Sequence, residues 1–532
     1  MIPIELIFAV VSSLILFLYG IEHFSGKIQQ IAGGSFRALI TRATSNRFSG
    51  ALLGAISTAI TQSSTAITVI TVSLVNSGTI SFAQSLGIII GANVGTTVTA
   101  QLVAFRLTTF GPVFIVLGFL LDLLGGRKYK FLGKPIFYFG LVFFALNLMS
   151  TTIAPLQDDP AISALFSYTS NVFIALLAGI LLTVLFQSSS VTTGLIVVFS
   201  VGGFLTLGQA IPLLLGANIG TTATALVASS GMSLFARRAG MAHFLFNVGG
   251  ALIFLPFLGI FAAFISSLGG TVAQQVANAH LIFNLVAAGI FLAAINPLKT
   301  AAERLVSGEE KEILLETKYL GKELPKSNAK AFSAIEKELG YSLDIALELL
   351  NDSMDVLETV SKELEDKVIK LEFLNDFLDE RIEAALLELS RRKLSEQEAL
   401  KTVLLVRISN AIERIGDSGK DIAEIAVEVA GKGRPLKPEL ASDLRECYDM
   451  LQKNISLLRE NFPAASQKIV DEIRANDNEL RRRITKQYQD QLSKLEEEGP
   501  LSDSTFLELL SIIESLNSKN REIRKLLEQY PK

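Results

Sequence analysis

The sequence repeats itself at a fixed distance of 125 residues. The block Gln62-Ser63-Ser64-Thr65 returns as Gln187-Ser188-Ser189-Ser190, and GANVGTT at 91–97 returns as GANIGTT at 216–222. No gap is needed between these blocks, so one register covers the whole span. A match of this kind indicates a duplicated structural unit. We therefore expect the first 250 residues to fold as two copies of one design.

The duplicated region is nearly free of charge. Residues 48–105 contain no Lys, Arg, Asp or Glu, and residues 1–305 hold 13 basic and 6 acidic residues, against 35 and 46 in the remainder. A mean hydropathy of +0.44 is too high for a soluble chain of 532 residues. We predict an all-α protein with a polytopic membrane domain followed by a soluble domain. The predicted layout is a transmembrane domain at 1–298 (repeat one at about 4–125, repeat two at about 131–250, further helices to 298), a linker at 299–328 and a helical domain at 329–532.

Composition excludes several other classes. Cys447 is the only cysteine, which rules out a disulfide framework and a cysteine metal cluster. The acidic second part argues against nucleic acid as a partner, since neutralising phosphates needs a basic face. Neither a nucleotide-binding loop nor a Ser/His/Asp constellation is recognisable, so we expect no enzyme.

Two apolar stretches, 49–75 and 172–201, are too long for a single crossing and carry glutamine at their middle. We interpret each as a re-entrant hairpin that enters and leaves on one side of the membrane. With the N-terminus outside, twelve of the thirteen basic residues of 1–305 then fall in cytoplasmic loops, as the positive-inside rule favours. The tail is cytoplasmic, and the two hairpins open from opposite sides. Inverted repeats with broken helices are typical of secondary transporters.

The hairpin middles carry the candidate chemistry. An unpaired polar group in hydrocarbon costs several kcal/mol, so Gln62 and Gln187 have to face protein or a cavity. Hydroxyls suit a small hard cation or an oxyanion, and each helix N-terminus adds about half a positive charge. An anion can thus be held without Lys or Arg. The candidate binding residues are Gln62, Ser63, Ser64, Thr65, Thr68, Asn93, Thr96, Thr97, Gln187, Ser188, Ser189, Ser190, Thr193, Asn218, Thr221 and Thr222.

Small polar residues also let membrane helices pack closely, and for an isolated Ser or Thr we prefer that interpretation. Packing alone does not demand Gln and Asn at the same register in both copies, so the paired blocks favour binding. His243 and His280 belong to a shorter repeat, AHxxFN. We expect them to cap or pack two helices rather than to relay protons.

These blocks carry a family resemblance. QSSTAIT and QSSSVTT, each followed by GANxGTT, resemble the paired signature of the type II sodium–phosphate cotransporters, over about residues 10–297. The resemblance implies uptake of inorganic phosphate driven by sodium, with Na⁺ as coupling ion and the hairpin residues lining the substrate and ion sites. Two alternatives remain open: a transporter of another oxyanion or an exporter, and a phosphate sensor that binds without transporting.

In the tail, apolar residues that recur at three- and four-residue spacing predict six helices. The break at Gly433-Arg434-Pro435 divides these helices into two sets of three. In the third helix Glu413, Asp417 and Asp421 share one face and repel one another unless a cation or Arg partners them. This block is similar to the ERIGD-type motif of PhoU domains. The resemblance implies a divalent or iron ion there, with a solvated charged face as the alternative. A homodimer or a regulatory protein could bind through this tail.

Overall fold

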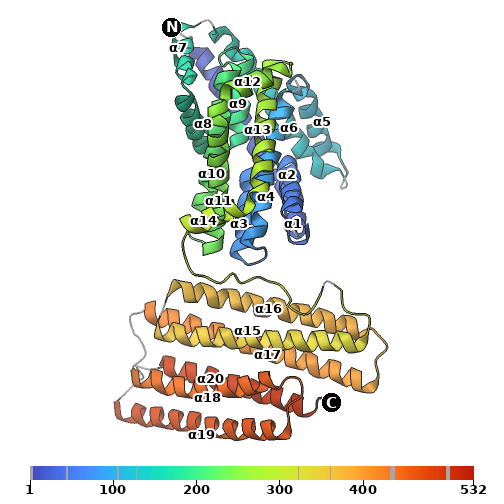
Figure 1. Cartoon of the computed structure of the whole chain (residues 1–532), viewed down its shortest axis with the longest axis vertical. Coiled ribbons are helices and arrows are strands. Elements are labelled where there is room, and N and C mark those ends of the chain that lie inside the picture. The colour runs from blue at the N-terminus through green and yellow to red at the C-terminus, as the bar shows by residue number, and fades with distance from the viewer. Residues whose placement is uncertain are drawn as a thin grey trace. The chain divides into compact units, whose positions relative to one another are not determined.

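The computed structural model describes residues 4–43, 46–104, 107–126, 129–157, 159–321, 323–359, 361–431, 438–498 and 504–531. Every regular element within these ranges is a helix, which confirms the predicted all-α fold. The chain divides into two compact units, Met1–Glu312 and Ile313–Lys532 (Figure 1). Arg106, Arg127, Lys128 and the Gly433-Arg434-Pro435 break, on which parts of the sequence prediction depend, lie outside the described residues.

The first unit is built from fourteen α-helices in its described part, and six of these are long and apolar enough to cross a membrane. The helix α8 forms a bent pair with the segment Pro160–Ser170 before it. The helices are α1 (Ile4–Ala43), α2 (Arg47–Thr61), α3 (Ser64–Asn76), α4 (Phe82–Ala104), α5 (Gly111–Leu124), α6 (Lys130–Ile153), α7 (Pro160–Ser167), α8 (Val172–Phe186), α9 (Ser189–Val201), α10 (Leu207–Ser229), α11 (Leu234–Phe254), α12 (Leu258–Ser267), α13 (Val272–Ala293) and α14 (Ile295–Leu305).

The first QSS segment is a hairpin of two short helices, α2 and α3. Ala51 lies against Gly91, and Ala55, one turn later in α2, lies against Gly95, one turn later in α4. The two helices therefore run in the same direction. Since α3 is the only helix between them, it has to bring the chain back to the side where α2 began. At about 1.5 Å per residue, neither hairpin arm reaches across a hydrocarbon core of about 30 Å.

The second repeat has the same geometry. Leu176 of α8 lies against Gly216 of α10, and Ile180 lies against Gly220, so α8 and α10 are also parallel and α9 returns between them. Each hairpin additionally packs on the other repeat, because α3 contacts α10 and α9 contacts α4. The two re-entrant hairpins thus interlock at the centre of the unit.

The repeats are inverted with respect to each other. Helix α1 of the first copy corresponds to α6 of the second, and these two helices pack side by side. Gly20 lies against Val142, whereas Phe24, one turn later, stacks on the earlier residue Phe139. Matching helices therefore run antiparallel, which is the relation that a pseudo-twofold axis in the membrane plane produces.

The segment after α14 binds back to the first unit. Arg238 of α11 is buried, and its guanidinium donates to the carbonyl oxygens of Val306 (3.0 Å) and Gly308 (2.9 Å). Glu312 accepts from the backbone N–H of Phe82 (2.6 Å), the first residue of α4. A carboxylate at a helix N-terminus is favourable, since free N–H groups point at it. The segment 306–312, part of the predicted linker, is thus fastened to the ends of two central helices.

The second unit contains the six predicted tail helices in two sets of three (Figure 1). Leu and Ile at three and four spacing fill one continuous core. Leu343, Leu374 and Ile412 are examples, and each is at most 2% exposed. The buried carboxylate of Glu338 accepts from three backbone N–H groups at 318–320 and so fixes the end of the linker to this unit. The helices are α15 (Asn328–Glu358), α16 (Lys362–Ser390), α17 (Glu396–Gly431), α18 (Pro438–Glu460), α19 (Gln467–Glu498) and α20 (Ser504–Glu528).

The close approach of α8 and α10 yields a stability prediction. A Cβ atom on Gly216 would overlap the backbone oxygen of Leu176, so Gly216→Ala has to push the two helices apart. We expect a loss of about 1–3 kcal/mol, typical of overpacking. Gly208→Ala, in the first turn of the same helix with nothing within 4 Å, is the control. The monodisperse fraction after heating in detergent, measured by size-exclusion chromatography, should fall for Gly216→Ala alone.

Candidate functional site

Each hairpin breaks at its glutamine. Gln62 ends α2 with φ of 55°, and Gln187 ends α8 with φ of 52°; they are the two non-glycine residues with positive φ in the described ranges. The left-handed conformation is costly for a residue with a Cβ and therefore marks positions that the surrounding packing holds in place. The side-chain amide of Gln62 donates to the carbonyl oxygen of Ala59, and its backbone N–H donates to Thr58.

The residue after each glutamine starts the next helix. The Ser63 hydroxyl accepts from the N–H of Ala66 (3.2 Å) and caps α3, and the Ser188 hydroxyl accepts from the N–H of Val191 (3.3 Å) and caps α9. The first turns of both helices therefore begin at the hairpin tips. Their free N–H groups and positive dipole ends are the kind of site that attracts an anion.

The two hairpin tips face one cavity. Its volume is about 640 Å³, and its walls come from α1 and from both QSS segments. Eight of the predicted binding residues line it: Gln62, Ser63, Ser64, Thr65, Gln187, Ser188, Ser189 and Ser190.

Thr99 of α4 connects the two tips directly. Its hydroxyl donates to the side-chain oxygen of Gln62 (2.6 Å), because that oxygen can only accept. The hydroxyl of Ser190 lies 3.3 Å from Thr99 and therefore acts as the donor to it. Thr99 thus holds a residue from each repeat at a fixed spacing.

A second group of polar side chains joins α10, which carries the second GANxGTT block, to α13. The amide of Asn218 donates to Asn284 (2.8 Å), and its oxygen faces the Nε2 atom of His280 at 3.2 Å. Because the Asn218 oxygen only accepts, His280 carries its proton on Nε2. His280 therefore joins α13 to α10 through a hydrogen-bonded triad.

The corresponding triad of the other half is not closed. The Nδ2 atom of Asn93, both ring nitrogens of His243 and the Oδ1 atom of Asn247 are buried and make no hydrogen bond within the described residues. These residues lie on α4 and α11, which pack against each other as α10 and α13 do. The duplicated framework thus holds its two polar triads in different states.

Besides Asn93 and Asn218, six predicted residues, all threonines, are not among those that line the cavity. All six are buried or nearly so, and the Thr96 and Thr221 hydroxyls donate to backbone oxygens one turn earlier in their own helices. The hydroxyls of Thr68 and Thr193 have no partner within the described ranges. These predicted residues away from the cavity wall are Thr68, Thr96, Thr97, Thr193, Thr221 and Thr222.

Residues outside the predicted set also contribute. Thr99 joins the tips, and Glu22 and Ser25 of α1 line the cavity. The signal that could have found them is the repeat register, which pairs Thr99 with Thr224, Glu22 with Asn147 and Ser25 with Ser150.

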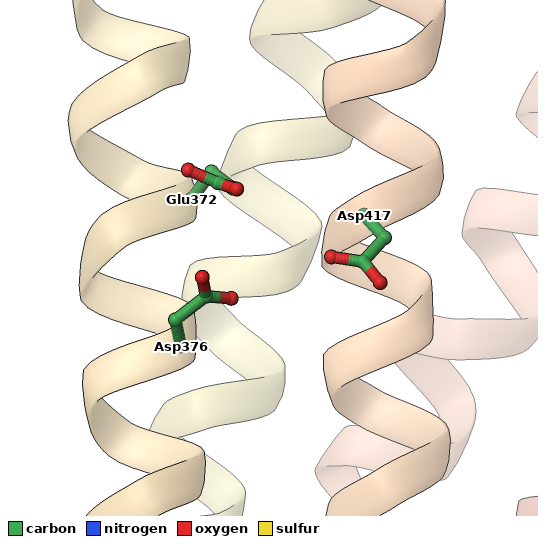
Figure 2. Close-up of side chains that lie close together, drawn as sticks. All are labelled: Glu372, Asp376 and Asp417. Carbon is green, nitrogen blue, oxygen red and sulfur yellow. The ribbon is translucent and has the colours of Figure 1, made fainter.

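The tail brings carboxylates together from two helices. Glu372 and Asp376 of α16 and Asp417 of α17 place oxygen atoms within 4.8 Å of one another (Figure 2). Lys420 donates to one oxygen of Glu372 (2.8 Å), while the other oxygen of Glu372 and one of Asp376 have no partner within the described residues. The sequence prediction named Glu413, Asp417 and Asp421. Of these three, only Asp417 belongs to the group that the structure brings together in its described part. The other two carboxylates of the group, Glu372 and Asp376, come from the neighbouring helix α16.

Crowding of these carboxylates changes their acidity. Burial and then the charge of Asp417 raise the pKa of Glu413 to about 7, and burial together with Glu372 and Asp417 raises the pKa of Asp376 to about 6. The pKa of Asp421 is also raised, by burial and by Asp417. The negative charge on this face is therefore only partly compensated by Lys420.

The second set of tail helices balances its charge differently. Asp477 of α19 lies 3.7 Å from the guanidinium of Arg524 on α20, and both side chains are almost fully buried. Burial raises the pKa of Asp477, while Arg524 opposes the shift. In this half the arginine side chain of Arg524 balances the buried carboxylate of Asp477. In the first half three carboxylates lie together.

The six membrane-capable helices indicate a multi-pass membrane protein, and its family identifies it as a transporter rather than an enzyme. The family model described as Na+/Pi-cotransporter matches residues 16–151 and 148–295, which together span more than half of the chain. The chain therefore belongs to this family. The PhoU domain model matches residues 342–426 in the first set of tail helices.

Several named proteins are similar to this chain. A "Putative inorganic phosphate export protein YjbB" of Escherichia coli K12 is 25% identical over 519 residues, 95% of this chain and 94% of that protein. The uncharacterized protein YqeW of Bacillus subtilis is 35% identical over 246 residues, 46% of this chain and 80% of its own. The mouse "Sodium-dependent phosphate transport protein 2C" is 37% identical over 147 residues, about a quarter of each chain. No solved structure matches significantly.

The raised pKa values predict how tail stability depends on pH. A carboxyl whose pKa is raised by folding binds its proton more tightly in the folded state, so stability decreases as pH rises from about 4 to about 7. With solvent screening we expect a loss of about 1 kcal/mol. Hydrogen exchange of α16 and α17 in the full-length protein, with chelator and with correction for intrinsic rates, should show weaker protection at pH 7.5 than at pH 5.5. Glu413→Gln should reduce this difference, and equal differences would contradict the prediction.

Proposed function

We propose that the protein transports inorganic phosphate together with sodium by alternating access between its inverted repeats. The observation that carries the proposal is the shared cavity, in which the tips of both re-entrant hairpins meet. Transport needs a site that each side of the membrane can reach in turn. Two hairpins that face one cavity from inverted repeats meet that requirement.

The chemistry of the cavity wall suits a small oxyanion. Among the described residues, the wall contains hydroxyls and two helix N-termini and no Lys or Arg, so an anion would be held by hydrogen bonds and dipoles. Such binding is weaker than an arginine clamp and lets the cargo leave again. Oxygen atoms of the same side chains suit a hard cation such as sodium. The remaining predicted residues, including Asn93 and Asn218, do not line this wall.

The direction of transport follows from the coupling. An inward sodium gradient drives phosphate inward when both ions move together. The name of the relative YjbB favours a second candidate, phosphate exit, because that relative is similar over nearly the whole chain, including the tail. Exit requires either countertransport or a downhill phosphate gradient, and the two candidates therefore differ in their response to sodium.

We further propose that the N-terminus lies outside and that the tail is cytoplasmic and regulates the transporter. The connection between the two parts supports regulation. Glu312 is bound at the start of α4, and the backbone at 318–320 is bound to Glu338. Few residues separate the two attachments, so a movement of the tail would be passed to the start of α4 through a short stretch of chain. A homodimer or a regulatory protein that binds the tail would act through the same connection.

A divalent or iron ion in the tail is part of this proposal. Glu372, Asp376 and Asp417 fit such an ion, since two of their carboxylate oxygens are buried without partners. The ion would neutralise a group of negative charges that Lys420 alone does not balance. Glu413 and Asp421 lie on the same helix as Asp417 and would contribute to the charge of the site.

Reconstitution tests the transport proposal. Purified protein in liposomes should take up radiolabelled phosphate faster with an inward sodium gradient than with an equal potassium gradient. Equal rates in the two salts would contradict sodium coupling. Release of trapped phosphate against its gradient by external sodium would favour exit, and binding without movement in either direction would favour a sensor.

Substitutions at the hairpin tips test the site. Ser64→Ala and Ser189→Ala each remove one hydroxyl from the cavity wall. We expect initial uptake rates to fall about tenfold for each, as the loss of a hydrogen bond to a charged group predicts. Ser12→Ala on the exposed face of α1 should leave uptake unchanged. Full activity in both tip variants would mean that the QSS blocks serve packing alone.

A further inference from the structure

Among the described residues, Glu22 of α1 is the one formally charged residue in the wall of the cavity that holds the hairpin tips. Its side chain is exposed to the cavity. Within the described residues, no Lys, Arg or His forms an ion pair with it, and the nearby Lys27 is bound to Gln30 instead. Among the described residues, the negative charge of Glu22 in the proposed phosphate cavity therefore has no basic partner.

Glu22 belongs to a polar stripe on one face of α1. Ser25 and Gln29 follow it one and two turns later, and both line the same cavity. The hydroxyl of Ser25 donates to the carbonyl oxygen of Thr61 (2.9 Å), the residue before Gln62, and the amide of Gln29 donates to Ser25 (3.2 Å). The stripe is thus fastened to the broken end of the first hairpin, next to the proposed phosphate site.

A carboxylate at this position repels phosphate unless a cation accompanies it. An oxygen-rich wall with one negative charge is a favourable environment for a hard monovalent cation, and the bound cation in turn attracts the anion. We propose that Glu22 is the cation-binding carboxylate that makes phosphate binding in this cavity depend on sodium. This inference rests on the proposed function and names the residue that enforces its coupling.

Only the first of the two repeats has a carboxylate at the position of Glu22. The register pairs Glu22 with Asn147 and Ser25 with Ser150, but Asn147 and Ser150 line a different cavity of about 360 Å³. That cavity is bounded by Val198, Thr271 and other residues, and none of the hairpin-tip residues lines it. The duplicated α1 and α6 thus present matching faces to two separate spaces, and the carboxylate occurs in the one that contains the tips.

The test compares Glu22→Gln with the wild-type protein by two independent measurements. The first is the sodium concentration that gives half-maximal phosphate transport in proteoliposomes. The second is equilibrium binding of radioactive sodium to the purified full-length protein in detergent, which does not require transport. We expect Glu22→Gln to weaken sodium about tenfold in both, equivalent to about 1.4 kcal/mol, while transport at saturating sodium persists.

Matched variants separate this role from general damage. Glu22→Asp keeps the charge and should retain most of the sodium dependence. Glu5→Gln removes an exposed carboxylate in the first turn of the same helix and should change nothing. Unaltered sodium affinity in Glu22→Gln, or equal losses in Glu22→Gln and Glu22→Asp, would overturn the inference. Sodium binding that depends on Glu22 in a protein that moves no phosphate would instead refute the proposed function and leave this site standing.

Discussion

The structure depends on one constraint, that a polar group inside a membrane has to face protein or a cavity rather than lipid. Gln62 and Gln187 lie in the middle of apolar stretches, and the chain breaks its helix at each of them. The break turns the ends of short helices toward each other and gives their free N–H groups a shared cavity. Glycines such as Gly91 and Gly216 let the neighbouring helices approach closely enough to hold the broken ends in place. Binding chemistry and packing are therefore two results of the same arrangement.

Duplication supplies the framework, and the two copies differ in several of their polar residues. Thr99 joins the two tips through Gln62 and Ser190, and the triad around His280 is closed while that around His243 is open. Glu22 brings a charge to one side, and its counterpart Asn147 is neutral. These departures from symmetry include Glu22 in the wall of the cavity, where a charge has a large effect on an ion.

The tail shows the same kind of divergence between similar halves. Its first set of helices gathers Glu372, Asp376 and Asp417, whereas its second set buries the pair of Asp477 and Arg524. A charge group that needs an external cation responds to its surroundings, and a group with its own arginine does not. Regulation through this tail would thus fall to the first set, which is also the part that the PhoU domain model matches.

The sequence by itself determined the class of the protein, since hydropathy, the 125-residue register and the QSS and GANxGTT blocks predict an all-α membrane domain with two hairpins. Apolar residues at three and four spacing also predicted six helices in the tail, and the described part of the tail has six. Only the tertiary structure decided which polar residues share a space. It brought Thr99 to the hairpin tips and Glu22 to the cavity wall, and it left Thr68 and Thr193 out of that wall. In the tail it brought Asp417 of α17 together with two carboxylates of α16. The physical reason is that spacing along a chain fixes which face of a helix a residue occupies, but the partner of that face is chosen by how the helices pack.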